Sequence, residues 1–423
     1  MTVELPDLQI NQMQLTEQLA ELASRSEPTR DPAAVTRRVF SQAHREGRQY
    51  LGELLAAAGI PFRQNEAGVL MARLETPGCD PTLPPIATGS HIDAIPESGR
   101  YDGTIGVLGG IAALVAIKEA GLQLRRPIEL LDFAEEPTVF GVGCLPSRIM
   151  SGFLPPAEAE LLLAEDGKTT FAMARASVGL TGPLAEAVLK PGHYAGWVEL
   201  HIEQGPRLES AGVPIGIVSN ISASATITAN FEGNGGHAGA VMMPDRGAEA
   251  LPAACQFANL ARDLTLAAPS PYAVCTVGKF TPFPGASNSI PSRVTLTVDV
   301  RDRETAARDA LLAQIRTAAR DSAGRFNANV ELTTLHQDPA AIADPAIMAA
   351  VARAAEHLGL ATMTLPSFAY HDTTFMSLIC PTTMIFVPSA GGHSHRPEEF
   401  THPKEIAQGV RTLALTLVQL ANE

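Results

Sequence analysis

The sequence predicts an α/β fold, in which a mostly parallel central sheet flanked by helices is interrupted by a smaller α+β domain. Between residues 68 and 136, apolar strand patterns alternate with a glycine-rich helical pattern, which is typical of βαβ units. Between residues 212 and 330, strands rich in β-branched residues are interleaved with two helices, which is typical of an α+β sandwich. A length of 423 residues is enough for two or three domains.

The elements follow one another in an order that makes the larger domain discontinuous. Apolar residues three and four positions apart predict helices over 15–26 and 32–59. The expected strands of the central sheet are 68–75, 85–94, 127–136, 196–205 and 383–389. Further helices are expected over 344–359 and 403–423. We therefore expect residues 1–211 and 331–423 to form one domain and residues 212–330 to form the insert.

Composition limits the possible partners. The chain has 31 Lys and Arg against 45 Asp and Glu, a net charge of −14, which argues against binding to nucleic acid. The five cysteines are far apart and form no CxxC pair, so neither a zinc knuckle nor a disulfide framework is expected. The apolar stretch 103–117 is too short to span a bilayer. The N-terminal residues lack a signal-peptide pattern, so we expect a cytoplasmic protein without membrane partners.

Imidazoles and carboxylates gather where the expected strands end. They are His91, Asp93, Asp102, Glu135, Glu136, His201, Glu203 and His395. The carboxyl ends of parallel strands are where ligands bind in α/β sheets. Imidazole and carboxylate ligands without cysteine suit zinc, manganese, cobalt or nickel. Any one pair is weak evidence, but the combination predicts two divalent ions held together by a bridging carboxylate.

Motifs along most of the chain resemble one enzyme family. They are GSHIDAIPESGRYDGTIGVLGG, AEEPTVFG, HIEQGP, GNGGHAGA, SNSIP followed by DVRD, and FVPS with SHRPEE. In this order they resemble the hydantoinase/carbamoylase amidohydrolases, within the di-metal aminopeptidase/carboxypeptidase clan. This family includes allantoate amidohydrolase, N-carbamoyl-L-amino-acid hydrolase and ureidoglycolate amidohydrolase. The resemblance implies a catalytic α/β domain with an inserted lid and dimerisation domain, and a homodimer.

The resemblance also implies a ligand set for two divalent metal ions. His91 and His201 would bind one ion, and Glu136 and His395 would bind the other. Asp102 would bridge the two ions. The identity of the metal stays open among zinc, manganese, cobalt and nickel.

Two further acidic residues have implied catalytic roles. Glu135 would be the general base that takes a proton from the metal-bridging water and passes it to the leaving nitrogen. Asp93 would orient His91, as metal-bound histidines usually require.

The remaining implied residues face the substrate. Gln204, His237, Asn288 and Arg301 match positions that bind the substrate or its tetrahedral intermediate. Arg301 can hold a carboxylate with its planar guanidinium, and His237 can stabilise an oxyanion. Three of these residues lie in the insert, so the insert of the same chain or of a partner chain must complete the site.

The chain departs from the family where Phe368 and Tyr370 replace two glycines of the common segment SGAGHD. These aromatic side chains predict a reshaped substrate pocket. EEPT replaces the more usual EEGS, a variant associated with ureidoglycolate-type members.

The function we expect is hydrolysis of a linear C–N bond in an N-carbamoyl or ureido carboxylate by a bridging hydroxide. An aminoacylase or dipeptidase that acts on N-acyl compounds with the same metal core is the alternative. A non-catalytic small-molecule binder is the rival from another class, and it need not hold two ions.

Overall fold

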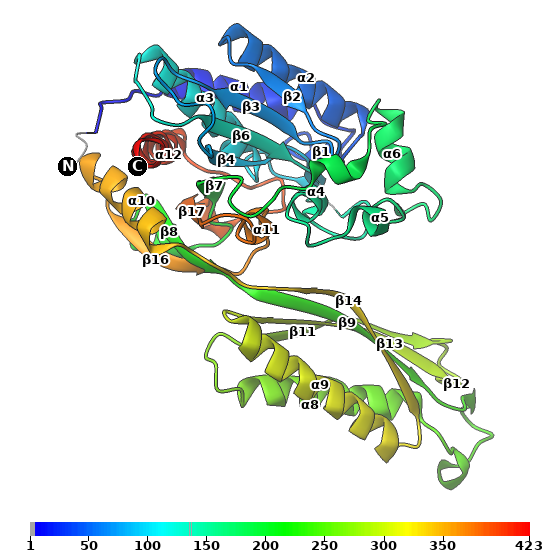
Figure 1. Cartoon of the computed structure of the whole chain (residues 1–423). Helices are drawn as coiled ribbons and strands as arrows, with labels where there is room; N and C mark the ends of the chain where they lie inside the picture. Colours follow the sequence, from blue (N-terminus) through cyan, green and yellow to red (C-terminus); the bar gives the residue numbers. More distant parts are fainter. Residues whose placement is uncertain (1–4, 135, 137) are drawn as a thin grey trace. The chain divides into compact units, whose positions relative to one another are not determined.

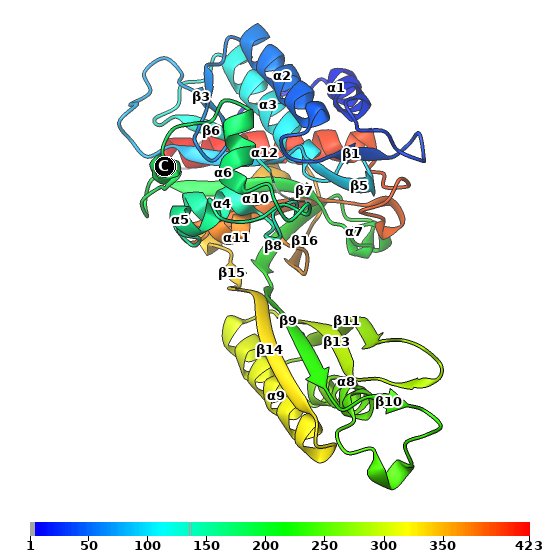
Figure 2. The same ribbon diagram turned by 90° about the vertical axis from the view of Figure 1, so that its right-hand side faces the viewer.

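The chain folds into two compact units in the computed structural model, which describes residues 5–134, 136 and 138–423. Unit 1 contains the residues up to Asn220 together with Ile342–Glu423, and unit 2 contains Ile221–Ala341. Figures 1 and 2 show the elements of both units.

Unit 1 is built on a large mixed sheet. Its strand order is β15-β8-β17-β7-β4-β6-β3-β2, and β16 pairs with β8. The strands are β2 (Phe62–Gln64), β3 (Leu70–Leu74), β4 (Ile86–His91), β6 (Ile128–Phe133), β7 (Gly196–Ile202), β8 (Ile215–Ile221), β15 (Ala341–Ile342), β16 (Thr362–Ser367) and β17 (Thr382–Val387). The central neighbours β17, β7, β4 and β6 run parallel, whereas β3 pairs with β6 and β8 with β17 in antiparallel fashion. The expected mostly parallel sheet is thus parallel at its centre and antiparallel further out.

Helices cover both faces of this sheet, and its central strands are therefore buried along their whole length. One core lies under the long helices α1 (Gln12–Ser24), α2 (Gln42–Ala57), α3 (Thr104–Glu119), α10 (Pro345–His357) and α12 (Pro403–Asn422). A second core includes residues of α4 (Leu145–Met150), α5 (Pro156–Ala159), α6 (Phe171–Ser177), η1 (Leu184–Ala187) and α11 (Thr373–Met376). The short elements α7 (Arg207–Ala211) and η3 (Ala390–Gly392) and the two-stranded sheet of β1 (Val35–Arg37) and β5 (Ala94–Ser98) complete unit 1.

The helix expected over 32–59 is shorter than the sequence pattern suggested. Residues Val35–Arg37 form β1 instead, which pairs with β5. Helix α2 begins only after Ser41, whose side chain caps the helix by accepting a hydrogen bond from the His44 backbone N–H.

Unit 2 is a four-stranded antiparallel sheet with two helices on one face (Figure 2). The strand order is β11-β13-β9-β14. Its elements are β9 (Ala223–Glu232), α8 (Ala250–Leu266), β11 (Val274–Phe283), β13 (Arg293–Asp302), α9 (Thr305–Arg325) and β14 (Asn329–Asp338). A short ladder of β10 (Gly236–His237) and β12 (Ser289–Ile290) and the turn η2 (Met243–Asp245) complete it.

The unit boundaries differ from the expected insert of 212–330 at both ends. Strand β8 pairs with β17 in the large sheet rather than with β9, and it is almost entirely buried. Strand β14, with its alternating exposure, pairs with β9 at the edge of the small sheet. A buried apolar strand suits the double-sided sheet, whereas an alternating strand suits a sheet with helices on one face.

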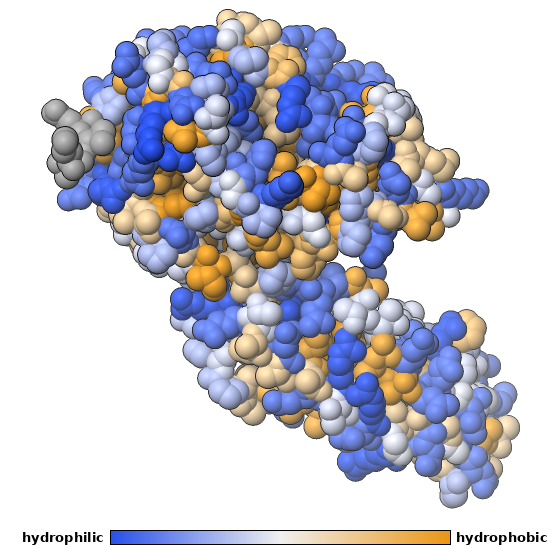
Figure 3. All heavy atoms as spheres, viewed as in Figure 1, coloured by the Kyte–Doolittle hydropathy of each residue, from blue (hydrophilic) through white to orange (hydrophobic). Residues whose placement is uncertain are grey.

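No helix among the described residues is long and apolar enough to cross a membrane. On the face drawn in Figure 3, hydrophilic and apolar residues are interspersed.

Candidate active site

Four of the five expected metal ligands lie at or after the carboxyl ends of the four neighbouring parallel strands, and the fifth, Asp102, lies at the start of α3. His91 is the last residue of β4, and His201 lies one residue before the end of β7. Glu136 follows β6, and His395 lies in the segment after β17. Asp102 directly precedes Gly103, the N-cap of α3. Parallel pairing of these strands brings their ends to one edge of the sheet, as the sequence predicted.

Asp102 is shared by two groups of side chains that could each hold a metal ion. One group contains His91, Asp102 and His201, and the other contains Asp102, Glu136 and His395. The Oδ1 atom of Asp102 lies 3.1 Å from His201 Nε2, and its Oδ2 atom lies 2.9 Å from His395 Nε2. His395 Nε2 also lies 3.2 Å from Glu136 Oε1. A carboxylate whose two oxygens face two ligand groups has the geometry of a bridging ligand.

The orientation of the His201 ring fits a metal ion. Its Nδ1 lies 2.9 Å from the carbonyl oxygen of Ile202, and because a carbonyl only accepts, Nδ1 carries the proton. In the neutral ring Nε2 is then an acceptor, and it receives the Gly103 backbone N–H at 3.2 Å. Facing it is Asp102 Oδ1, a buried acceptor without a hydrogen-bond partner among the described residues. Two acceptors this close are compatible when a cation lies against both, which the donor set of Asp102 and histidines provides for.

Charge at the site also favours cations. Hydrogen bonds to Asp102 and Glu136 raise the pKa of His395 to about 10, although burial opposes this. Burial acts to raise the pKa of Asp102, but when the facing Nε2 atoms of His201 and His395 carry protons, their hydrogen bonds hold this pKa well below its usual value. Asp102 is therefore ionised over the physiological pH range and is available to bind metal.

Close packing of the loop before α3 requires a glycine. Gly103 has a φ of +65°, and a Cβ there would lie 2.4 Å from ring atoms of His91. The glycine thus lets Asp102 approach the histidines and starts the helix in a conformation that other residues disfavour.

Asp93 contacts both His91 and the backbone of Glu136, which follows β6. Its Oδ1 lies 3.4 Å from His91 Nδ1, which also lies 3.0 Å from the Asp93 carbonyl oxygen. Its Oδ2 accepts a hydrogen bond of 3.0 Å from the Glu136 backbone N–H. Glu135, the expected general base, lies outside the described residues.

Gln204 contacts the bridging carboxylate. Its amide Nε2 lies 3.1 Å from Asp102 Oδ2 and 3.3 Å from Ser394 Oγ. Gln204 has a φ of +57° and His395 a φ of +60°, conformations that non-glycine residues adopt rarely.

The segment with the two unusual aromatic residues lies next to His201. His371, in the same segment, packs edge-on against the His201 ring with centroids 4.6 Å apart. Tyr370 accepts a hydrogen bond of 2.6 Å from the Arg148 guanidinium, and Arg207 lies 5.7 Å from the Phe368 ring centroid. Both aromatic side chains are half-buried.

Sequence reasoning missed a buried network behind the ligands. Glu199 accepts hydrogen bonds from Ser90 Oγ at 2.8 Å and from Thr373 Oγ1 at 2.5 Å, and Trp197 Nε1 donates to Thr373 Oγ1 at 2.7 Å. Glu199 lies two residues before His201 on β7, and this spacing, which places both on one face of the strand, was the available signal. The network fixes the strand that carries His201.

Glu399 was also missed, although it belongs to the SHRPEE motif. It is 4% exposed and accepts a hydrogen bond from the Asp102 backbone N–H. Its position in a polar, proline-containing segment is typical of an exposed loop residue, so only the tertiary structure identifies it.

Of the three expected substrate residues of the insert, His237 and Asn288 lie close together in unit 2, whereas Arg301 lies apart from them. Ladder β10–β12 pairs His237 with Ser289, and the Ala238 N–H donates to the Asn288 carbonyl oxygen at 2.9 Å, so His237 and Asn288 are neighbours. Arg301 lies near the far end of β13, eight residues after Arg293, about 26 Å along an extended strand. Its guanidinium donates to Asp299 at 2.8 Å. His237 and Asn288 are exposed in unit 2.

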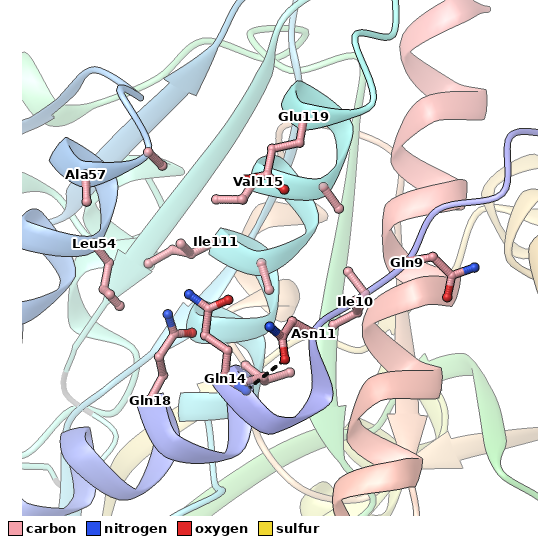
Figure 4. A pocket seen from close by; sticks show the side chains of 14 residues that line it. Gln9, Ile10, Asn11, Gln14, Gln18, Leu54, Ala57, Ile111, Val115 and Glu119 are labelled. Atoms are coloured by element: carbon pink, nitrogen blue, oxygen red, sulfur yellow. Dashed lines mark hydrogen bonds between the residues drawn. The ribbon is translucent and has the colours of Figure 1, made fainter.

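The cavity drawn in Figure 4 is separate from this site. It has a volume of about 590 Å³ and lies between α1, α2 and α3, lined by Gln14 and Gln18 on one side and Leu54 and Val115 on the other. None of its lining residues is among the expected site residues.

Comparison with known proteins identifies the family. The model of peptidase family M20/M25/M40 matches residues 87–419. A ureidoglycolate hydrolase of Arabidopsis thaliana is 40% identical over 428 residues, which cover 100% of this chain and 87% of the relative. An N-carbamoyl-L-amino acid amidohydrolase of Geobacillus stearothermophilus is 34% identical over 388 residues, covering 92% and 93% of the two chains. A crystal structure of AtUAH in complex with glyoxylate superimposes with a TM-score of 0.87 at 39% identity, covering 98% of this chain and 99% of the other.

These matches extend over nearly the whole chain and confirm the resemblance that the motifs indicated. The family is metal-dependent, in agreement with the ligand groups around Asp102. The chain therefore belongs to peptidase family M20/M25/M40, and within it to the hydantoinase/carbamoylase group of amidohydrolases.

Proposed function

We propose that the protein hydrolyses the ureido C–N bond of a small carboxylate, with ureidoglycolate as the preferred substrate class. The observation that carries this proposal is the pair of ligand groups that share Asp102. The higher identity to a ureidoglycolate hydrolase than to an N-carbamoyl-amino-acid amidohydrolase favours a ureido substrate, as does the EEPT variant.

The proposed centre holds two divalent ions. His91 and His201 would hold one ion, Glu136 and His395 would hold the other, and Asp102 would be a ligand of both. Bound there, the cations supply positive charge that polarises the scissile carbonyl and lowers the pKa of water. We leave zinc, manganese, cobalt and nickel as candidates, because imidazole and carboxylate ligands suit each of them.

The chain's own residues transfer the proton, orient the ligands and shape the pocket. Glu135 takes the proton from the attacking water and delivers it to the leaving nitrogen, while Asp93 keeps the His91 ring oriented. Gln204 holds Asp102 from one side, and Phe368 and Tyr370 shape the pocket beside His201.

Unit 2 supplies the substrate contacts in this proposal. Arg301 holds the substrate carboxylate with its guanidinium, and Asn288 and His237 stabilise the developing oxyanion. The separation of Arg301 from His237 along β13 supports the idea that two copies of unit 2 contribute to one site.

We also propose a homodimer formed through unit 2. Strand β11 is an edge strand of its sheet, and Val274, Phe280 and Phe283 on it are exposed at 43%, 38% and 53%. Unpaired edge strands with apolar side chains are sites of strand pairing between chains. The five free cysteines fit the cytoplasmic location that we propose.

Hydrolysis of four compounds tests the function. Ammonia release is measured for ureidoglycolate, allantoate and an N-carbamoyl amino acid, and release of the free amino acid is measured for an N-acetyl amino acid. We expect the highest kcat/KM for ureidoglycolate, and loss of all activity after chelation with recovery on adding metal. Faster hydrolysis of the N-acetyl compound would instead establish the aminoacylase alternative. Activity that survives complete metal removal would contradict the mechanism.

A further inference from the structure

The two candidate metal sites differ in how their ligands are held. His91 lies on β4, opposite Phe133 of the parallel strand β6, and His201 lies on β7, opposite Phe386 of the parallel strand β17. His395 lies instead between β17 and α12, in a segment whose only regular element is the single turn η3. A ligand in such a segment depends on side-chain contacts for its position.

One buried carboxylate makes these contacts. Glu399 Oε1 accepts hydrogen bonds from the backbone N–H groups of Tyr101 at 2.8 Å and Asp102 at 3.1 Å. Its Oε2 accepts from Ser394 Oγ at 3.2 Å and from the His395 backbone N–H at 3.3 Å. The two oxygens thus join chain segments almost 300 residues apart, one with the bridging ligand and one with a terminal ligand.

We propose that Glu399 is a positioning residue that sets the distance between Asp102 and His395, and so controls occupancy of the site formed by Asp102, Glu136 and His395. This inference rests on the proposed two-metal centre. The site of His91 and His201 depends on it less, because its histidines are fixed by the sheet.

The four donors explain why a carboxylate is needed. Oε1 of Glu399 receives two backbone N–H groups, and Oε2 receives the His395 N–H and shares the Ser394 hydroxyl with Asp102 Oδ2, so both ends of the group must be acceptors. Glutamine has the same shape, but its NH₂ group would face one pair of donors. Glu399→Gln therefore removes acceptor capacity at one end while leaving the packing almost unchanged.

A neighbouring glycine offers a second, steric test. A Cβ at Gly99 would lie 2.3 Å from both Cβ and Oε1 of Glu399, too close for the present position of the carboxylate. Gly99→Ala therefore displaces Glu399 without changing its chemistry. Glu209→Gln is a matched control, because Glu209 Oε2 accepts from the Gly391 N–H in the same segment but contacts no expected metal ligand.

The experiment is a calorimetric titration of metal-free protein with Co²⁺, with bound metal counted by elemental analysis. We expect two ions in the wild type. In Glu399→Gln and Gly99→Ala the affinity for one ion should fall by about 10–100-fold, the cost typical of outer-shell changes. The affinity for the other ion, and both affinities in Glu209→Gln, should change by less than about threefold.

A double variant identifies the site that is affected. His395→Ala should leave one ion bound, and adding Glu399→Gln to it should not weaken that ion further, because the two changes act on the same site. Further weakening, equal loss of both ions in Glu399→Gln, or wild-type affinities in both Glu399→Gln and Gly99→Ala would overturn the inference. A wild type that binds only one ion would contradict the two-metal proposal itself.

Discussion

Asp102 is the residue on which the candidate centre depends most, because its two oxygens face different histidines. His201 Nε2 lies 3.1 Å from one oxygen and His395 Nε2 lies 2.9 Å from the other. The type of residue was readable from the sequence, since an aspartate before a glycine-rich helix is conspicuous. Only the tertiary structure shows that each oxygen faces a different histidine, because His201 and His395 lie on segments distant in sequence.

Glu135 is the residue whose role is tested most directly by substitution. Glu135→Gln should lower kcat by at least about 100-fold, the usual contribution of a general base, because the amide cannot accept the proton from water. Bound metal, counted by elemental analysis, should stay at the wild-type level, since Glu135 is not an expected ligand. A variant with near wild-type kcat would contradict the assignment of the base.

Asp372 predicts a pH dependence of stability. Burial and the nearby charge of Glu199 raise its pKa from 3.8 to about 8. Between about pH 4 and pH 8, the folded state keeps this proton and the unfolded state releases it. The free energy of unfolding therefore falls as the pH rises through this range. Asp372→Asn, which keeps the neutral form, should therefore raise the Tm of metal-free protein more at pH 8 than at pH 5.

The measurement is thermal unfolding of both proteins across this pH range. The exposed Asp166 serves as control, because Asp166→Asn changes no buried carboxyl. A Tm difference between Asp372→Asn and wild type that stays constant from pH 5 to pH 8 would contradict the raised pKa.

At the scale of elements, α3 lies against the parallel strands through glycines. A Cβ on Gly106 would lie 2.5 Å from the Leu200 carbonyl oxygen and 2.7 Å from Ser90 Cβ. The sequence shows a glycine-rich helical pattern here, and the structure shows which backbone the helix approaches. Since Asp102 directly precedes this helix, its docking also places the bridging ligand.

Gly106→Ala should destabilise the protein by about 1–3 kcal/mol, because the backbone in contact cannot move aside as a side chain can. Gly324→Ala is the matched control, since Gly324 also lies in a helix but a Cβ there meets nothing within 4 Å. It should stabilise by about 0.4–1 kcal/mol through the unfolded state. Urea denaturation measures both, and equal effects of the two changes would contradict the packing argument.

Element types were more predictable than their partners. The strand patterns that became β4, β6, β7 and β17 were recognisable, because buried parallel strands are continuous apolar runs. The pairing of β8 was not, because β8 and β9 are adjacent in sequence and both rich in β-branched residues. The pairing partner of β8 is determined by the large sheet, where β8 pairs with β17.

At the scale of the whole molecule, the net charge of −14 is a sum over the chain and does not give the local charge at the candidate site. Two divalent cations and Arg301 would add positive charge at a place where an anionic substrate must bind. The charge of the whole chain argues against nucleic acid but does not oppose a carboxylate substrate.

The proposed dimer predicts complementation between two inactive variants. If His237 acts in the partner's site, a heterodimer of His237→Ala and Glu135→Gln chains contains one complete site. Mixing and exchanging equal amounts should then restore activity to about a quarter of the wild-type sites, since half of the dimers are mixed. Sedimentation should show dimers throughout.

The outcome distinguishes the possible arrangements. No recovery in exchanged heterodimers would show that His237 acts within its own chain. A monomer at micromolar concentration would contradict the dimer altogether.

The sequence by itself determined the fold class and the family, because apolar runs and motifs are local patterns, and through the family resemblance it predicted five metal ligands. Those patterns also predicted a site of imidazole and carboxylate ligands rather than thiolates. The tertiary structure decided which oxygen of Asp102 faces which histidine, that Glu399 joins residues almost 300 positions apart, and that β8 belongs to the large sheet. These are contacts between distant segments, and their geometry arises from sheet pairing and buried hydrogen bonds, which no local pattern records.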